Sequence, residues 1–268
     1  MTKISIPNVA HMLVIASGKG GVGKTTVSVN VALALAAQGA RVGLFDADIY
    51  GPNVPLMLGI RRSQSAHGLL PIARAESEPY IPPLERYGLK VMSIGLLVGE
   101  GDAVMPDPHD VGRIVTQTLR DVRWGALDYL IIDLPPGTGE PQHSLIRAFQ
   151  IDGVIIVTTP QDLSLLDASR SLGMFRQATI PILGIIENMS YLICPHCGEH
   201  VEVFHRSNRH WGVESEQLEI LGRVPMDIAI SRGIDSGHPL VQASPTAVEA
   251  TVFQEIATKA ARKLTNKQ

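Results

Sequence analysis

Short apolar segments alternate with amphipathic segments along most of the chain. Seven apolar segments of strand length are predicted as β-strands, and they cover residues 12–16, 41–45, 89–93, 129–132, 154–158, 182–187 and 220–224. Several of them are apolar throughout, which is typical of a parallel sheet that is covered on both faces. The pattern therefore predicts a sheet buried between two layers of helices.

Helical spacing fills the gaps between these segments. Residues 25–38 are rich in Ala and Val and end before Gly39, a typical stop for a helix. Apolar residues recur at helical spacing over 111–119 and again over 248–264. This alternation predicts an α/β fold, a doubly wound, mostly parallel sheet with helices on both faces and right-handed crossovers.

Two stretches interrupt the alternation. Residues 61–87 are rich in Pro, Ser and charged side chains, which predicts an excursion over the surface. Residues 189–211 hold both cysteines of the chain and four of its histidines, which predicts a small hairpin insert. We therefore expect one domain over 1–268, with the cysteine-containing insert at 189–211 inside it.

One glycine-rich segment matches the pattern G-x-x-x-x-G-K-[ST] between a predicted strand and a predicted helix. The segment comprises Gly18, Lys19, Gly20, Gly21, Val22, Gly23, Lys24, Thr25 and Thr26. Its glycines allow successive backbone N–H groups to face one phosphate chain, and the helix that follows adds its positive N-terminus. We expect Lys24 to reach the β- and γ-phosphates of ATP and the Thr25 hydroxyl to bind Mg²⁺.

Acidic residues follow two of the predicted strands. Asp46 and Asp48 lie where the strand 41–45 ends, and Asp133 ends the strand at 129–132. In α/β sheets ligands bind at this edge, so these carboxylates can approach a metal ion and an attacking water. We expect Asp133 to hold Mg²⁺ through water. The Pro-Pro-Gly-Thr-Gly loop at 135–139 is expected to track the γ-phosphate and to change its order on hydrolysis.

Composition narrows the partners of the predicted ATPase. The net charge of −3 argues against a general nucleic-acid-binding surface, which is normally basic. No window approaches the run of about 18 apolar residues that a transmembrane helix needs, and residues 1–12 lack the features of a secretory leader. We therefore expect a cytoplasmic protein that binds neither a membrane nor nucleic acid.

The two cysteines, Cys194 and Cys197, form a C-x-x-C pair. Two thiolates in such a turn can bind one zinc ion or part of an iron–sulfur cluster. Since a [4Fe–4S] cluster usually takes four thiolates, a symmetric homodimer would supply all four. Three alternatives remain: a single-chain Cys₂His₂ zinc site with His200 and His205, a thioredoxin-like redox pair, and two structural thiols.

Five segments together resemble the Mrp/ApbC family of P-loop ATPases. They are the phosphate loop, Asp-Ala-Asp-Ile-Tyr-Gly-Pro at 46–52, Asp-Leu-Pro-Pro-Gly-Thr-Gly at 133–139, Thr-Thr-Pro-Gln-Asp at 158–162, and Glu-Asn-Met-Ser at 187–190 followed by Cys-Pro-His-Cys-Gly at 194–198. The resemblance runs from about 12 to 241, and MinD- and ParA-like proteins lack its cysteine element. Departures from the family pattern fall at 105–110 and 205–210, and many relatives carry an extra N-terminal domain ahead of the phosphate-loop strand.

The resemblance implies a function and several residue roles. The family consists of ATP-dependent carriers that work as homodimers and pass a [4Fe–4S] cluster to apo-proteins. Lys19, which marks the deviant Walker A class, is then expected to contact the nucleotide of the partner chain, and Asp48 is expected to position the attacking water. Asp46 is expected near Mg²⁺, while Asn188 and the segment from Pro225 to Asp227 are expected to flank the adenine.

Hydrolysis in such a carrier is expected to couple the loop at 135–139 to the cysteine pair. Two further functions compete with it. A MinD- or ParA-like positioning ATPase would need a membrane helix or a basic surface, whereas the small apolar residues of the last predicted helix, at 246–264, favour core packing. A zinc-stapled signalling ATPase would bind one zinc ion per chain.

Overall fold

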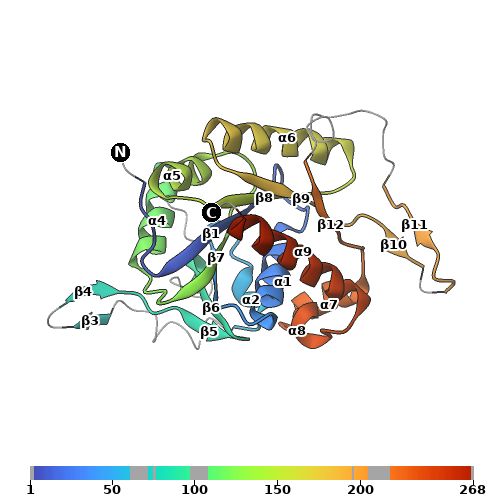
Figure 1. Ribbon diagram of the computed structural model, residues 1–268, viewed down its shortest axis with the longest axis horizontal. Helices are drawn as coiled ribbons and strands as arrows, with labels where there is room; N and C mark the ends of the chain where they lie inside the picture. The colour runs from blue at the N-terminus through green and yellow to red at the C-terminus, as the bar shows by residue number, and fades with distance from the viewer. Residues whose placement is uncertain are drawn as a thin grey trace.

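One eight-stranded sheet forms the centre of the molecule (Figure 1). The computed structural model describes residues 3–60, 72–74, 77–96, 108–194, 196–204 and 218–266. The strand order is β12-β9-β8-β1-β7-β2-β6-β5. Its members are β1 (Val9–Ala16), β2 (Val42–Asp46), β5 (Leu84–Arg86), β6 (Leu89–Ser93), β7 (Leu127–Asp133), β8 (Gly153–Thr158), β9 (Ile182–Glu187) and β12 (Ile220–Arg223).

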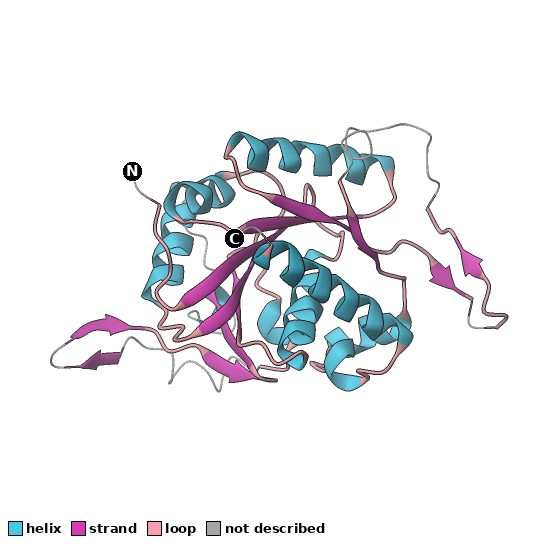
Figure 2. Ribbon diagram, in the orientation of Figure 1, coloured by secondary structure: helices cyan, strands magenta, loops and turns pink. Residues whose placement is uncertain are grey.

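Helices cover both faces of this sheet (Figure 2). One layer contains α4 (Pro108–Asp121), α5 (Glu140–Ala148) and α6 (Asp162–Gln177). The other contains α1 (Lys24–Ala37), α2 (Val54–Met57), α7 (Ile228–Asp235), α8 (Leu240–Ala243) and α9 (Val248–Thr265). A 3₁₀ turn, η1, covers Ile94–Leu96 after β6.

Strand β1 shows why the central strands have no polar face. Met12 and Val14 pack into the core beneath α4, α5 and α6, while Leu13 and Ile15 pack into the core beneath α1 and α9. All four side chains are at most 2% exposed. Because both faces are covered, an uninterrupted apolar segment is what this position requires.

The seven predicted strands are confirmed, and so is the mostly parallel, doubly wound sheet. The excursion predicted at 61–87 contains more structure than expected in its described part. Strands β3 (Ile72–Arg74) and β4 (Ser77–Tyr80) pair with each other, and β5 adds an antiparallel edge to the main sheet. Positive φ angles at Tyr87 (52°) and Gly88 (75°) form the two-residue turn between β5 and β6, as a type I′ hairpin requires.

The cysteine pair lies on a separate two-stranded ribbon, β10 (Leu192–Ile193) and β11 (His200–Val201). The ribbon extends from the body of the molecule beside β12, at the right of Figure 1. An isolated bridge between Leu192 and Met226 joins it to the segment that follows β12. Among its described residues, none belongs to either buried core. Residues 205–211 of the predicted insert lie outside the described part.

The last helix, α9, packs against α1, which agrees with the core packing expected for residues 246–264. Its Phe253, Ile256 and Leu264 are buried in the core on that face of the sheet. In the described part of the chain, no helix combines the length and the hydropathy that crossing a membrane would require.

Candidate functional site

The phosphate loop connects the carboxyl end of β1 to α1, and it is enclosed on two sides by close contacts, one with backbone and one with a side chain. A Cβ atom on Gly18 would lie 2.1 Å from the backbone of Asp167 in α6. Gly23 has φ of 78°, and a Cβ there would lie 2.2 Å from Nδ2 of Asn188. These two positions therefore require glycine, for contact distance at the first and also for backbone conformation at the second.

Lys24 and Asp133 form a buried ion pair at the base of the loop. Lys24 Nζ lies 2.6 Å from Asp133 Oδ1, and the two side chains are 6% and 0% exposed. The Thr25 hydroxyl donates to Asp133 Oδ2 at 2.8 Å, and the Ser28 hydroxyl donates to Oδ1 at 2.6 Å. Three donors on a single helix end thus compensate the desolvation of the carboxylate.

Asp46 lies beside Asp133, because the two residues are register partners on β2 and β7. Its carboxylate accepts hydrogen bonds from the backbone N–H groups of Asp48 and Val54 and from the Ser93 hydroxyl. Complete burial, followed by repulsion from Asp133, raises the pKa of Asp46 to about 7. A second positive charge, in addition to that of Lys24, would favour the ionised form of both Asp46 and Asp133.

This donor set fits a magnesium ion. A hydroxyl on Thr25 and carboxylates on Asp46 and Asp133 are the hard oxygen ligands that Mg²⁺ takes, usually together with water and phosphate. The sequence predicted these three residues as metal ligands, and the structure places Thr25 and Asp133 in direct hydrogen-bond contact.

The predicted catalytic residues Lys19 and Asp48 line one cavity of about 220 Å³ together with the phosphate loop. Asp48 Oδ1 accepts a hydrogen bond from the Gly51 backbone, which orders the segment after β2. The Lys19 ammonium group donates to Gln161 Oε1 at 3.4 Å, so within one chain it is turned towards the start of α6. The cavity therefore combines backbone amides, two cations of the loop and one carboxylate.

A second cavity, of about 350 Å³, adjoins the first and shares Gly23 and Thr26 with it. Asn188, Pro225 and Asp227, the residues expected around the adenine, all line it. Asn188 Nδ2 also donates to the Val22 carbonyl at 2.8 Å and so fixes the phosphate loop to the end of β9. The two cavities together have the layout of a nucleotide site, with one compartment for phosphates and one for a base.

The cysteines occupy a tight turn at the tip of the ribbon. The Gly198 N–H donates to the Cys194 carbonyl at 2.9 Å, and the Cys194 N–H donates to the Glu199 carbonyl at 2.9 Å. Hydrogen bonds from the backbone of Cys197 and then of His196 lower the pKa of the Cys194 thiol. Cys197 is exposed and Cys194 is partly exposed, so both thiols can be reached from solvent.

Within the described residues, no three His, Cys, Asp or Glu side chains come together as a metal site. His200 stacks on Tyr191 with ring centroids 4.7 Å apart, and His205 of the alternative zinc site lies outside the described part. In the described part of the chain, His200 therefore does not form a metal site with the two thiols.

A family model for ParA proteins, described as the NUBPL iron-transfer P-loop NTPase, matches residues 8–261. This chain belongs to that family. The iron–sulfur cluster carrier protein of Deinococcus radiodurans is 42% identical to it over 257 residues, which cover 96% of this chain and 70% of the relative. The iron–sulfur cluster carrier protein of Pyrococcus abyssi is 40% identical and covers 95% of this chain and 86% of its own length.

Solved structures agree with this membership in the iron-transfer NTPases. A nucleotide-binding protein from Archaeoglobus fulgidus in complex with ADP has a TM-score of 0.71 and 33% identity, covering 86% of this chain and 88% of its own. The cell division ATPase MinD of Pyrococcus furiosus has a TM-score of 0.66 and 24% identity, covering 94% of this chain and 99% of its own. The second likeness is one of fold alone.

Three residues that contact the site were not predicted from the sequence. Ser28 follows Thr25 by one helical turn, so the spacing could have indicated that it faces Asp133. Ser93 reaches Asp46 only because β6 pairs with β2, and the sequence gives no sign of that register. Gln142, which contacts the loop after β7, also carried no recognisable pattern.

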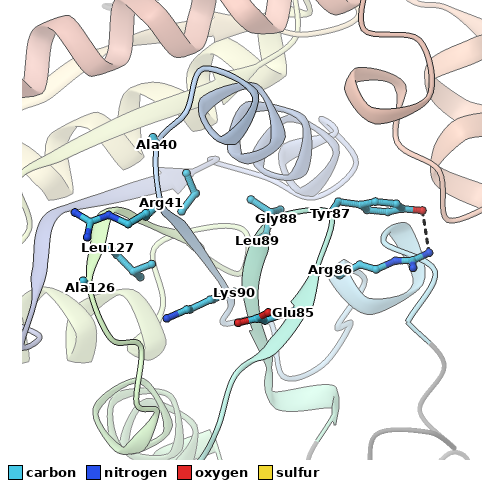
Figure 3. A pocket seen from close by; sticks show the side chains of 11 residues that line it. Ala40, Arg41, Glu85, Arg86, Tyr87, Gly88, Leu89, Lys90, Ala126 and Leu127 are labelled. Carbon is cyan, nitrogen blue, oxygen red and sulfur yellow. Dashed lines mark hydrogen bonds between the residues drawn. The ribbon is translucent and has the colours of Figure 1, made fainter.

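Another hollow of about 380 Å³ lies at the amino ends of β2, β6 and β7, at the opposite edge of the sheet (Figure 3). The cationic side chains that line it already have partners within this chain. Arg41 pairs with Asp128 at 2.6 Å, Lys90 donates to a backbone carbonyl, and Arg86 donates to the Tyr87 hydroxyl. We assign no ligand to this hollow.

The raised pKa of Asp46 predicts a pH dependence of stability. The unfolded chain loses this proton near pH 4 and the folded NTPase near pH 7, so the free energy of unfolding should fall by roughly 1–3 kcal/mol between about pH 4 and pH 7. Urea unfolding of the magnesium-free, nucleotide-free protein measures this slope, which should be flatter in Asp46→Asn.

Asp128→Asn is the matched control, because hydrogen bonds from Arg41 lower the pKa of Asp128 to about 2 and it titrates below this window. An equal slope for the wild type and Asp46→Asn would contradict the assignment.

Proposed function

We propose that this chain is an ATP-hydrolysing iron–sulfur cluster carrier that acts as a homodimer and passes a [4Fe–4S] cluster to apo-proteins. The observation that carries the proposal is the continuity between the two sites. Asn188, which holds the phosphate loop, and Cys194, which begins the thiol turn, lie on one connected stretch of seven residues after β9. The cytoplasm, a reducing compartment, is the environment in which two exposed thiols stay available for cargo.

ATP binding is assigned to the two adjoining cavities. Lys24 and the amides of the phosphate loop bind the phosphates, and Asn188, Pro225 and Asp227 bind the base. Thr25, Asp46 and Asp133 would hold a magnesium ion, which would neutralise part of the negative charge of the phosphates. The buried pair of carboxylates, one of them with a raised pKa, supports this placement.

Hydrolysis is assigned to Asp48 and Lys19. Asp48 borders the phosphate cavity and orients the attacking water, whose oxygen bonds to the γ-phosphorus as the bond to ADP breaks. Lys19 of the partner chain stabilises the charge that develops on the phosphates. In the single chain, Lys19 lines the phosphate cavity and its ammonium group donates to Gln161 at the start of α6.

Asp48→Asn should leave the affinity for Mg-ATP within about threefold of wild type and slow phosphate release on the order of 10²-fold, because it keeps the shape and removes the charge. Lys24→Ala should abolish nucleotide binding. Calorimetry and a phosphate-release assay measure the two effects, with Asp128→Asn as the carboxylate control at the other edge of the sheet. Wild-type hydrolysis by Asp48→Asn would refute its role, and wild-type binding by Lys24→Ala would refute the site.

Cluster binding is assigned to Cys194 and Cys197 from both chains of the dimer. Anaerobic reconstitution with iron and sulfide should load about four iron and four sulfide ions per dimer, the content of one [4Fe–4S] cluster. Cys194→Ala and Cys197→Ala should each lose this cargo and keep nucleotide binding. His196→Ala is the matched control, since His196 lies in the same turn and is expected to contribute its backbone rather than its ring.

Two outcomes would replace the carrier with another function. Normal iron loading by both cysteine variants would remove the thiols from the cargo site. About one zinc ion per chain and no iron in freshly isolated protein would favour a zinc-stapled ATPase.

The nucleotide state reaches the thiols along a ladder of backbone hydrogen bonds. Val224 donates to the Glu187 carbonyl, Ser190 donates to the Val224 carbonyl, and Met226 donates to the Tyr191 carbonyl at 2.7 Å. The same ladder carries Asn188 and Met226 on the wall of the base cavity. The Gly137 N–H donates to the carbonyl of Ser17, the residue before the phosphate loop, and Asn188 donates to the Val22 carbonyl within that loop. Movement of the loop at 135–139 therefore reaches the ribbon through the phosphate loop and Asn188.

This route predicts that the base acts on the thiols in addition to the γ-phosphate, because Asn188 and Met226 line the base cavity. Mg-ADP should change the rate of thiol labelling at Cys194 and Cys197 of the cluster-free protein by at least about threefold, whereas Mg-pyrophosphate should leave it unchanged. Stopped-flow labelling with a chromogenic disulfide measures both rates. An equal effect of the two ligands would assign the coupling to the phosphate cavity alone.

A further inference from the structure

Gln142 is a buried side chain on α5 that holds the loop after β7. It is 1% exposed, and its Nε2 donates to the Pro135 carbonyl at 2.7 Å and to the Pro136 carbonyl at 3.3 Å. Carbonyl oxygens only accept hydrogen bonds, so the amide has only one possible orientation here, with its NH₂ group towards the loop. The two prolines have no backbone N–H, so their carbonyls are the backbone groups through which hydrogen bonds can hold this part of the loop.

The other end of the same amide has no partner. Oε1 of Gln142 is fully buried and accepts no hydrogen bond from any residue that the structure describes. A Cβ placed on Gly139 would lie 3.6 Å from this oxygen, so the unpaired acceptor is next to the far end of the loop. Buried side-chain acceptors are nearly always paired in folded proteins, so this one needs an explanation.

The loop itself borders the phosphate compartment. Pro136 lines that cavity, and the Gly137 N–H donates to the Ser17 carbonyl at 2.9 Å, just before the phosphate loop begins. Gly137 has φ of 88°, whereas Thr138 and Gly139 are exposed. A phosphate group that enters the cavity therefore meets a loop fastened at its first half by Gln142 and Ser17, with its second half open to movement.

We propose that Gln142 is a positioning residue that stabilises this loop in either of two alternative conformations. In the place seen here, Nε2 holds the carbonyls of Pro135 and Pro136. When a triphosphate fills the cavity, the second half of the loop moves inward and a backbone N–H of Thr138 or Gly139 donates to Oε1. In this proposal Gln142 does not contact the nucleotide. It makes the loop sensitive to the γ-phosphate because its Oε1 accepts a hydrogen bond in only one of the two loop conformations.

This inference rests on the proposed ATPase function and is tested by nucleotide discrimination. Gln142→Met keeps the side-chain volume and removes both hydrogen-bonding ends. The ratio of affinities for Mg-AMPPNP and Mg-ADP should fall at least fivefold in this variant, the affinity for Mg-ADP should change less than twofold, and kcat should fall about tenfold. A residue with a merely structural role would weaken both nucleotides in proportion. Gln117→Met, at an exposed position on α4, is the matched control.

A wild-type affinity ratio together with wild-type kcat in folded Gln142→Met would overturn the inference and leave the ATPase proposal intact. A wild-type protein that binds no Mg-nucleotide would overturn both. Hydrogen exchange on the wild type gives an answer even where the variant does not fold. The amides of Thr138 and Gly139 should gain protection with Mg-AMPPNP over Mg-ADP, and equal exchange with both nucleotides would overturn the inference.

Discussion

The buried ion pair between Lys24 and Asp133 is the interaction on which the rest of the site depends. It joins the first turn of α1 to the end of β7, and its two side chains are only 6% and 0% exposed. Removing one partner of a buried pair typically costs about 3–5 kcal/mol, because the other charge is left uncompensated. A phosphate chain offers Lys24 an alternative anion, and magnesium offers Asp133 an alternative cation. The pair therefore holds the site together through the same groups that a bound nucleotide would use.

Sequence patterns predict the core of this fold well, because the central strands must be apolar on both faces. The same reasoning fails for β5 and the ribbon strands. Those strands are only two or three residues long, so a periodic pattern of apolar and polar residues cannot be recognised in them. They are specified by their turns, such as the positive φ angles at Tyr87 and Gly88.

The candidate site divides along the same line. Residues within one local motif, from Gly18 to Thr26, are readable because the chemistry of phosphate binding fixes their spacing. Contacts that depend on tertiary register are not, since Ser93 meets Asp46 across 47 positions and Asn188 meets Val22 across 166. Asn188 was reachable only through family resemblance. Gln142 was invisible to both approaches, because its role follows from the direction of one amide group.

The thiol turn is carried on a ribbon that contributes nothing to either buried core in the described part of the molecule. Substitutions there act on a peripheral appendage, so they are under little pressure from folding. The spacing or identity of the two thiols can drift through evolution while the nucleotide-binding body keeps its shape. A ribbon of different sequence could therefore be transplanted to this position without loss of the two buried cores.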